Sequence, residues 1–317
     1  MKAVALFSGG LDSLLAIKLI QNQNIQVKAI NFTTPFFTNK KAIEQARLNN
    51  IDLISIDITK DYLKMLKKPK HGYGKNLNPC IDCKIFMLKQ AKKYAKKINA
   101  NFIFTGEVLG ERPMSQNKPT LFVIEKESGL KNTLLRPLSA KLLPKTIIEK
   151  NRLVDRNKLL DIQGRSRKPQ LELVKKYNIK NFETPAGGCL LTDSQFTKKL
   201  KDLIKHKKSI NNNDLEILKI GRHFRYKTSK IIVGRNYNEN QILLQLKNKN
   251  DFIFEVLDEP SPITILQGKI NKNSIKIAAS LTARYSDSKK DFIPVRYNNK
   301  IINVNKIDEN LLNNLRI

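Results

Sequence analysis

Cysteine is scarce in this chain of 317 residues, which contains three. So small and odd a number cannot build the disulfide framework of a compact secreted protein. Long apolar runs are also missing, since none approaches the ~20 residues that cross a bilayer. The apolar residues 3–7 are too few for a signal peptide and end at Ser8-Gly9-Gly10. We therefore expect a protein of the reduced cytoplasm, with no membrane partner.

Acidic residues are few beside basic ones. The chain has 28 Asp and Glu against 59 Lys and Arg, which gives a net charge of +31. So positive a surface attracts polyanions, and nucleic acid is the commonest large polyanion of the cytoplasm. Lysine and asparagine are abundant along the whole chain, so the base composition of an AT-rich genome is the alternative explanation of the charge.

The first hundred residues alternate between strand-like apolar runs and helical patterns. Strands are expected at 3–7, 27–32, 53–58 and 101–105, and helices at 13–21, 40–49, 61–66 and 83–98. Repeated βα units predict an α/β fold with a parallel sheet, helices on both faces and ligands at the carboxyl ends of the strands.

The second half has a different pattern. We predict a first domain at 1–206, with a core at 1–150 and an extension at 151–206, then a polar linker and a small α+β domain at 214–317. Extended segments are expected at 134–143, 231–233, 242–246, 252–256, 263–266 and 292–297, and helices at 168–177, 195–205 and 274–285.

A glycine-rich loop, Ser8-Gly9-Gly10-Leu11-Asp12-Ser13, lies between the first predicted strand and the first predicted helix. Its two glycines let backbone N–H groups close around an anion, and the helix start adds free N–H groups and a positive dipole end. The Ser8 and Ser13 hydroxyls are further donors. A carboxylate at Asp12 would repel a bare phosphate, so it favours a Mg²⁺ ligand or a loop-shaping role. A plain glycine-rich turn is the alternative.

This hexapeptide resembles the PP-loop signature of the ATP pyrophosphatase family. The resemblance implies an adenine-nucleotide alpha-hydrolase-like fold that cleaves ATP between its α and β phosphates and leaves AMP on an acceptor oxygen. It also implies nucleotide contacts at Asn31 and Phe32 after the second strand and at Thr105-Gly106 after the fourth. Arg112, a little further on, is a candidate cation near the nucleotide.

All three cysteines lie in turn-like motifs. Cys80 and Cys83 form a C-x-x-C at the start of a predicted helix, and Cys189 ends Pro185-Ala186-Gly187-Gly188-Cys189. Three chemistries compete for them. A [4Fe–4S] cluster held by three thiolates leaves one iron open, a redox pair carries sulfur as a persulfide, and structural zinc needs a histidine as fourth ligand.

The stretch from Asn78 to Lys84 resembles the Asn-Pro-Cys-x-x-Cys-Asn motif of tRNA 2-thiouridine synthases, with Lys84 in place of the last asparagine. Joined to a PP-loop and a distant cysteine, it also resembles the cluster-dependent tRNA thiolases and the 4-thiouridine synthase adenylation domain. These resemblances imply catalytic roles for Cys80, Cys83, Cys189 and Asp12. They imply ATP, Mg²⁺, tRNA and a sulfur donor, either a persulfide-carrying protein or free sulfide.

Two basic motifs are candidates for RNA contact. Gly164-Arg165-Ser166-Arg167-Lys168 puts three cations before a predicted helix, and arginine grips phosphate through two hydrogen bonds. Gly221-Arg222-His223-Phe224-Arg225 and the segments after it resemble the NFACT-R module of RNA-associated proteins over 221–295. The predicted RNA contacts are Arg165, Arg167, Lys168, Arg222, His223 and Arg225. Ordinary solvated or structural roles are the alternative.

Taken together, the motifs favour an ATP-dependent tRNA uridine thiolase, a tRNA sulfurtransferase. One alternative is a PP-loop amide ligase that acts on a small molecule. The other is an RNA-binding accessory protein with a vestigial nucleotide site, which predicts RNA affinity without ATP–pyrophosphate exchange.

Overall fold

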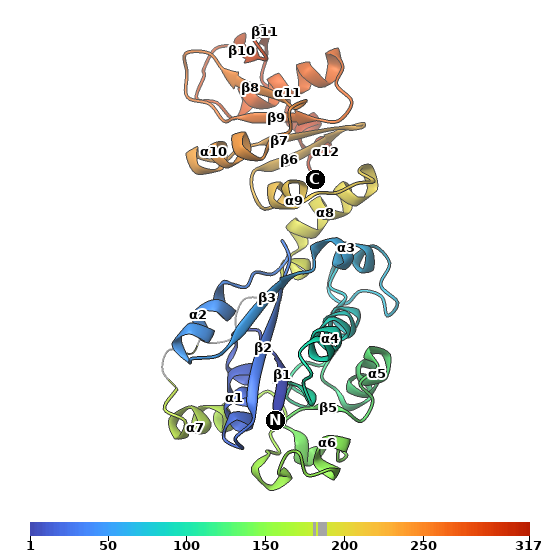
Figure 1. The fold of residues 1–317 in the computed structure, drawn as a ribbon. Coiled ribbons are helices and arrows are strands. Elements are labelled where there is room, and N and C mark those ends of the chain that lie inside the picture. Colours follow the sequence, from blue (N-terminus) through green and yellow to red (C-terminus); the bar gives the residue numbers. More distant parts are fainter. Residues whose placement is uncertain (180–181, 183–188) are drawn as a thin grey trace. The chain divides into compact units, whose positions relative to one another are not determined.

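The computed structural model describes residues 1–179, 182 and 189–317. They form two compact units, Met1–Asp193 and Ser194–Ile317 (Figure 1). Within the described residues, no helix is both long and apolar enough to span a bilayer.

The first unit contains a parallel sheet, as predicted. Its strands are β1 (Lys2–Leu6), β2 (Gln26–Thr33), β3 (Leu53–Asp57), β4 (Phe102–Thr105) and β5 (Leu134–Leu135). They lie in the order β3-β2-β1-β4-β5, and every neighbouring pair is parallel. The chain leaves β1 in one direction and returns to its other side at β4. Such a switch point is where open α/β sheets bind ligands.

Helices cover both faces of this sheet. They are α1 (Leu11–Gln21), α2 (Lys40–Leu48), α3 (Thr59–Lys67), α4 (Cys80–Lys97), α5 (Lys118–Ser128), α6 (Ile147–Lys150) and α7 (Lys168–Lys176). In Figure 1, α1 and α7 lie on one side of the sheet and α4 and α5 on the other. Eight of the eleven residues of α1 are buried, because the helix lies between the sheet and its neighbours. This enclosure fixes the start of α1 relative to the strand ends.

The predicted extended segment at 134–143 is only partly correct. Two residues pair with the sheet, and Ala140–Leu142 form a 3₁₀ turn instead. Between them, the carbonyls of Pro137 and Leu138 accept hydrogen bonds from Leu160 and Ile162. The backbone therefore finds its partners in the following connection, and the sheet does not continue.

The second unit is the small α+β domain predicted from the sequence. Its strands are β6 (Arg222–Tyr226), β7 (Ser229–Val233), β8 (Phe252–Val256), β9 (Thr264–Gln267), β10 (Ile293–Tyr297) and β11 (Lys300–Val304). They form an antiparallel sheet in the order β11-β10-β8-β9-β7-β6. The helices are α8 (Ser194–His206), α9 (Asn212–Glu216), α10 (Tyr237–Leu246), α11 (Lys272–Arg284) and α12 (Glu309–Leu315). Residues of α11 and of the strands share one apolar core.

The extended segment expected at 242–246 was wrong, because these residues form the second half of α10. The Asn236 side chain accepts a hydrogen bond from the backbone N–H of Glu239 and so caps this helix. Leu243 is fully buried while Ile242 is 39% exposed. The apolar run therefore winds around a helix, with Leu243 directed into the core, and the polar residues at the start of the helix hid this from the sequence pattern.

The polar stretch 207–213, predicted to be a linker, lies inside the second unit, which begins at Ser194. Lys207 pairs with Asp214 at 2.6 Å, and the Asn211 side chain caps α9. Asp202 on α8 binds Arg225 of β6. These contacts attach α8 to the C-terminal sheet, so the division between units falls before α8 and not after it.

Candidate active site

The loop between β1 and α1 is shaped by its own serines. Ser8 Oγ accepts a hydrogen bond from Gly10 N at 3.3 Å and lies 3.3 Å from Ser13 Oγ. Ser13 Oγ donates to the Gly10 carbonyl at 2.8 Å. Gly10 is the N-cap of α1, and no side chain of the described residues caps this helix. Its first N–H groups and its positive dipole end are therefore available to an anion.

Two glycines let neighbouring segments approach this loop. Gly9 has φ +79°, and a Cβ there would lie 2.7 Å from Ala42 N at the start of α2. A Cβ at Gly106, after β4, would lie 2.5 Å from Ser13 N. Real side chains do not tolerate such distances, so both positions need glycine. The loop is thus held between α2 and the turn after β4.

Asp12 is tied to a distant helix. Gln170 on α7 donates from Nε2 to Asp12 Oδ1 at 3.2 Å. Burial raises the pKa of Asp12, while the Gln170 hydrogen bond and the charges of Arg167 and Arg112 act to lower it. Arg112 therefore lies near the loop, as predicted. Arg167, predicted to contact RNA, acts on the same carboxylate. No motif or spacing in the sequence pointed to Gln170.

Two buried side-chain oxygen atoms, one on β2 and one on α7, lack a hydrogen-bond partner within the described residues. Asn31 donates from Nδ2 to the Phe7 carbonyl at 2.8 Å, which leaves its Oδ1 without a partner. Gln170, 1% exposed, has no partner for Oε1. Unsatisfied buried oxygens are costly, and a ligand with amino or hydroxyl donors would satisfy them. This observation, with the two glycines, fits a nucleotide at the switch point. Phe32, the other residue predicted to contact the nucleotide after the second strand, is only 4% exposed.

A charged network missed by the sequence analysis follows β4. Buried Glu107 accepts hydrogen bonds from Lys84 Nζ at 2.6 Å, Arg136 Nε at 2.9 Å and Thr105 Oγ1 at 3.1 Å. Burial opposes ionisation, but the cations Lys84 and Arg136 outweigh it and lower the pKa of Glu107 to about 2. Arg136, only 2% exposed, also binds Glu125. The network fixes the turn at Thr105-Gly106.

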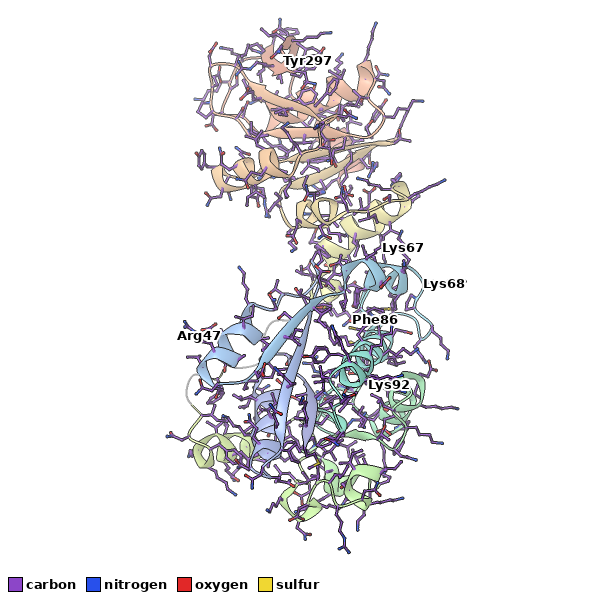
Figure 2. All side chains as sticks on the ribbon, viewed as in Figure 1. Arg47, Lys67, Lys68, Phe86, Lys92 and Tyr297 are labelled. Atoms are coloured by element: carbon purple, nitrogen blue, oxygen red, sulfur yellow. The ribbon has the colours of Figure 1, made fainter. Side chains whose placement is uncertain are left out.

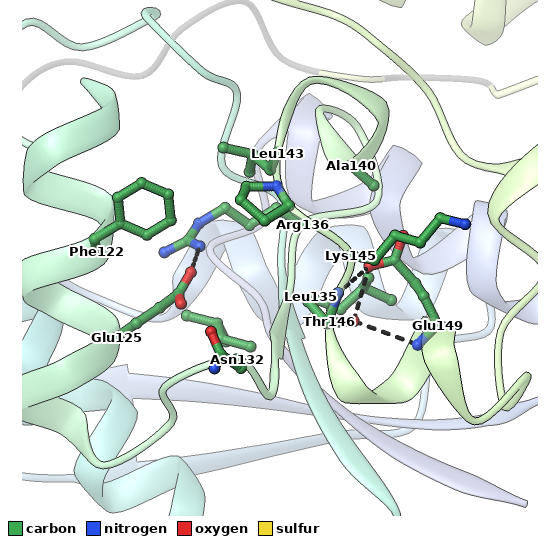
Figure 3. A pocket seen from close by; sticks show the side chains of 12 residues that line it. Phe122, Glu125, Asn132, Leu135, Arg136, Ala140, Leu143, Lys145, Thr146 and Glu149 are labelled. Carbon is green, nitrogen blue, oxygen red and sulfur yellow. Dashed lines mark hydrogen bonds and ion pairs between the residues drawn. The ribbon is translucent and has the colours of Figure 1, made fainter.

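The small pocket beside Arg136 is not the nucleotide site. Figure 3 shows Arg136 directed at Glu125, with Phe122, Thr146 and Glu149 around the same pocket. Its volume of about 20 Å³ holds roughly one water. None of its lining residues belongs to the glycine-rich loop.

The segment of Cys189 is anchored beside the C-x-x-C helix. Leu77 N donates to the Leu191 carbonyl at 3.2 Å, and Asn76 Nδ2 donates to the Thr192 carbonyl at 2.7 Å. Leu190 N donates to the Phe36 carbonyl, just after β2, at 3.4 Å. Cys189 is thereby brought to the loop that precedes Cys80. Pro185–Gly188 of the predicted motif lie outside the described residues.

The three thiols are close enough to act on one another electrostatically. Burial of the Cys83 thiol raises its pKa to about 12, and the charges of Cys189 and Cys80 act in the same direction. Burial also raises the pKa of Cys189. None of the three forms a disulfide. The predicted trio therefore does converge, in a setting that keeps Cys83 and Cys189 protonated.

Tyr62 on α3 is a second residue that sequence reasoning missed. Its hydroxyl hydrogen-bonds the Cys83 thiol, and this bond lowers the pKa of Cys83. The ring is 1% exposed and packs against Phe36 at 5.9 Å, Phe37 at 5.4 Å and Phe86 at 6.2 Å between ring centres. Phe86 is labelled on α4 in Figure 2. These contacts hold the hydroxyl at the thiol.

A metal centre is not assembled around these thiols. Across residues 1–179, 182 and 189–317, no group of three or more His, Cys, Asp or Glu side chains is placed to hold a metal ion. The histidine nearest in sequence to the C-x-x-C, His71, faces the carboxylates of Asp82 and Glu127. Neither the cluster nor the zinc hypothesis gains support from this arrangement, and we derive no step through either.

The predicted RNA contacts divide into two groups. Arg165 and Lys168 are exposed on the first unit, where Figure 2 also labels the exposed Lys67, Lys68 and Lys92. In the second unit His223 is 2% exposed and bonds the Ile220 carbonyl, so its side chain cannot meet RNA at the surface.

The two arginines of the second motif have partners inside the second unit. Arg225 forms a two-pronged pair with Asp202. Arg222 lies over the Tyr285 ring at 4.4 Å. Arg225 is therefore mainly structural, whereas Arg222 has a guanidinium stacked on an aromatic ring, a geometry that also suits bases.

Comparison with known proteins supports the resemblance to the 4-thiouridine synthase adenylation domain and the resemblance to the NFACT-R module. Residues 1–152 match the family described as thiamine biosynthesis protein (ThiI), and residues 221–314 match the NFACT protein RNA binding domain. The probable tRNA sulfurtransferase of Thermococcus kodakarensis is 30% identical over 148 residues, 43% of this chain and 36% of that protein. The one of Ureaplasma parvum serovar 3 is 32% identical over 151 residues, 44% and 37% of the two chains. The chain thus spans a little over a third of these relatives' length. A crystal structure of a 4-thiouridine synthetase–RNA complex with bound ATP shares 24% identity, with a TM-score of 0.36 and coverage of 55% and 50%.

Proposed function

We propose that this protein is an ATP-dependent tRNA uridine sulfurtransferase that acts in the cytoplasm. The observation that carries the proposal is that one unit contains both an uncapped helix start at Gly10 and three neighbouring thiols, Cys80, Cys83 and Cys189. The sulfurtransferase name of the relatives that match this region supports the same reaction. The NFACT-type match at 221–314 and the net charge of +31 support an RNA substrate.

The first step activates a poor leaving group. A carbonyl oxygen of uridine attacks the α-phosphorus of ATP, the bond to the β-phosphate breaks, and pyrophosphate leaves. The N–H groups at the start of α1 and the hydroxyls of Ser8 and Ser13 would bind the leaving phosphates. Asp12 would hold Mg²⁺, which supplies charge neutralisation of the phosphates when bound. Asn31 Oδ1, without a partner in the described residues, would accept from the adenine amino group.

The second step replaces AMP with sulfur. The terminal sulfur of a persulfide on one cysteine attacks the activated carbon, and AMP leaves with the former carbonyl oxygen. A second cysteine thiolate then attacks the cysteine-bound sulfur, so that a disulfide forms and the thiocarbonyl remains on the nucleoside. A dithiol reductant returns the disulfide to two thiols. The persulfide sulfur comes from a persulfide-carrying protein, which passes its outer sulfur to a thiolate of this chain and keeps a thiol. Sulfide can supply it only by attacking the disulfide between the two cysteines, which leaves a persulfide on one and a thiolate on the other.

The test measures pyrophosphate release and thiouridine formation with purified protein, ATP, tRNA, a persulfide-carrying protein as the sulfur source and a dithiol reductant. We expect pyrophosphate release that requires tRNA, and a Cys189→Ser protein that releases pyrophosphate but makes no thiouridine. RNA binding without pyrophosphate release would identify an accessory protein instead. Release with a small-molecule amide acceptor, and not with tRNA, would identify a ligase.

Purification of the protein under anaerobic conditions distinguishes the two routes for sulfur. A colourless, iron-free protein with full activity supports the persulfide route. If the protein instead absorbs broadly in the visible range and needs its bound iron for activity, the result supports the cluster route and contradicts the persulfide step.

A further inference from the structure

Lys84 joins the C-x-x-C helix to the turn after β4. It directly follows Cys83, and its ammonium lies 2.6 Å from Oε1 of Glu107. The Lys84 side chain is 24% exposed, whereas Glu107 is 3% exposed. A partly accessible cation is therefore held by a buried carboxylate that belongs to another segment of the fold.

The carboxylate end of this pair is fixed without Lys84. Glu107 Oε2 accepts from Thr105 Oγ1 at 3.1 Å and from Arg136 Nε at 2.9 Å. Arg136 is itself buried and bound to Glu125. Because Thr105 and Arg136 both hold the Glu107 carboxylate, its Oε1 gives the Lys84 ammonium a defined position.

The same turn touches the glycine-rich loop. Gly106 lies between Thr105 and Glu107, and a Cβ there would be 2.5 Å from the backbone of Ser13. The backbones of Gly106 and Ser13 therefore leave no room for a side chain between them, and such close packing couples the movements of the two segments. A shift at the start of α1 must therefore move the residue next to Glu107. The charge of Lys84 also acts on Glu111, as that of Asp12 does.

We propose that Lys84 is a positioning residue that couples occupancy of the nucleotide site to the thiol of Cys83 through its ion pair with Glu107. The inference rests on the proposed ATP site and deepens it. A nucleotide at the loop displaces the turn at Gly106, the Glu107 carboxylate moves with it, and Lys84 carries the change into the first turn of α4. The reactivity of the Cys83 thiol would then depend on whether a nucleotide is bound, so that sulfur transfer follows activation of the substrate.

The test measures the alkylation rate of Cys83 by iodoacetamide, followed on the Cys83 peptide by mass spectrometry. Rates are compared with and without α,β-methylene-ATP and Mg²⁺, a probe that the enzyme cannot cleave between its α and β phosphates. In the wild-type protein the nucleotide is expected to change the rate at least about fivefold. Lys84→Met is expected to abolish this change while nucleotide affinity stays within about twofold of wild type. Lys84→Arg should retain the effect, and Lys89→Met, an exposed lysine on the same helix, should match the wild type.

Two results overturn the coupling. One is a Lys84→Met protein with wild-type melting temperature and an intact nucleotide effect; the other is a wild-type protein that binds the nucleotide but shows no effect. If Lys84→Met does not fold, the Glu107→Gln protein takes its place and should show no nucleotide effect on the alkylation rate. A nucleotide effect that persists in Glu107→Gln would also overturn the coupling. An intact effect in a protein that makes no thiouridine contradicts the sulfurtransferase function and leaves the coupling standing. A wild-type protein that does not bind the nucleotide would contradict both the coupling and the sulfurtransferase function.

Discussion

The side chain of Gln170 donates a hydrogen bond to the carboxylate of Asp12 over 3.2 Å, although 158 positions separate the two residues in the chain. The contact joins the first turn of α7 to the first turn of α1. Gln170 is 1% exposed, and its Oε1 has no partner among the described residues. The glutamine thus orients the carboxylate and leaves a buried acceptor beside it.

Gln170→Met tests this role, because methionine keeps the volume and removes the donor. Burial raises the pKa of Asp12 and the Gln170 bond lowers it, so the variant should raise that pKa further. Asp12 then ionises only at a higher pH. As the pH is lowered, the variant should therefore lose Mg²⁺–ATP binding, measured by calorimetry, at a higher pH than the wild type does. Leu171→Ala, at an exposed position of the same helix, is the control. Identical pH limits in wild type and Gln170→Met would contradict the assignment.

Gly106→Ala tests the close approach of the β4 turn to the glycine-rich loop. The added methyl would meet the Ser13 backbone at 2.5 Å, so the loop or the turn must move. Overpacking of this kind costs about 1–3 kcal/mol of folding free energy, and ATP affinity should fall with it. Urea unfolding and ATP titration measure both. At Gly74 a Cβ would meet chiefly the end of the flexible Met114 side chain, so Gly74→Ala should change neither quantity much. Wild-type ATP affinity in Gly106→Ala would contradict the close approach of the β4 turn to the glycine-rich loop.

Glu107→Gln tests the buried charge network through its pH dependence. The pKa of Glu107 is about 2 in the folded protein and 4.5 ordinarily. Between these values the unfolded chain binds more protons, so the carboxylate stabilises the fold fully above pH 4.5 and loses this contribution as the pH falls toward 2. The wild type should therefore exceed the variant by about 3 kcal/mol near neutrality, and the difference should shrink on acidification. Urea unfolding of both proteins at several pH values measures it; a difference independent of pH would refute the assignment.

Tyr62→Phe tests the hydrogen bond to Cys83. The hydroxyl lowers the pKa of Cys83, so its removal should raise that pKa and slow alkylation of Cys83 at a fixed pH. Peptide mass spectrometry after timed iodoacetamide treatment gives the rate. Tyr73→Phe, which removes a hydroxyl bound to the Leu66 carbonyl, should leave the rate unchanged. Faster alkylation in Tyr62→Phe would mean that the tyrosine shields the thiol and does not activate it.

The sequence predicted the features that depend on local pattern. The alternation of apolar runs and amphipathic helices indicated the parallel sheet, and the glycine-rich loop appeared at the expected strand end. The convergence of Cys189 with Cys83 followed from the motif resemblance and agrees with the structure. Such features need only neighbouring residues or a known motif to be recognised.

What the sequence could not indicate are pairings between distant charged residues. Arg136 and Glu107 look like ordinary surface residues in a chain so rich in charge, yet they are 2% and 3% exposed. Arg225 belongs to a basic motif that favours RNA binding, but Asp202 binds it within the second unit. Burial of a charge depends on a partner brought by the fold, and no local spacing records that partner.

The most direct test of the proposed reaction is mass spectrometry of tRNA nucleosides from a strain that lacks this protein. We predict the loss of one thiolated uridine, its return with the wild-type gene, and no return with Cys189→Ser or with Asp12→Asn. A nucleoside profile unchanged by the deletion would contradict the proposal that this chain places sulfur on tRNA.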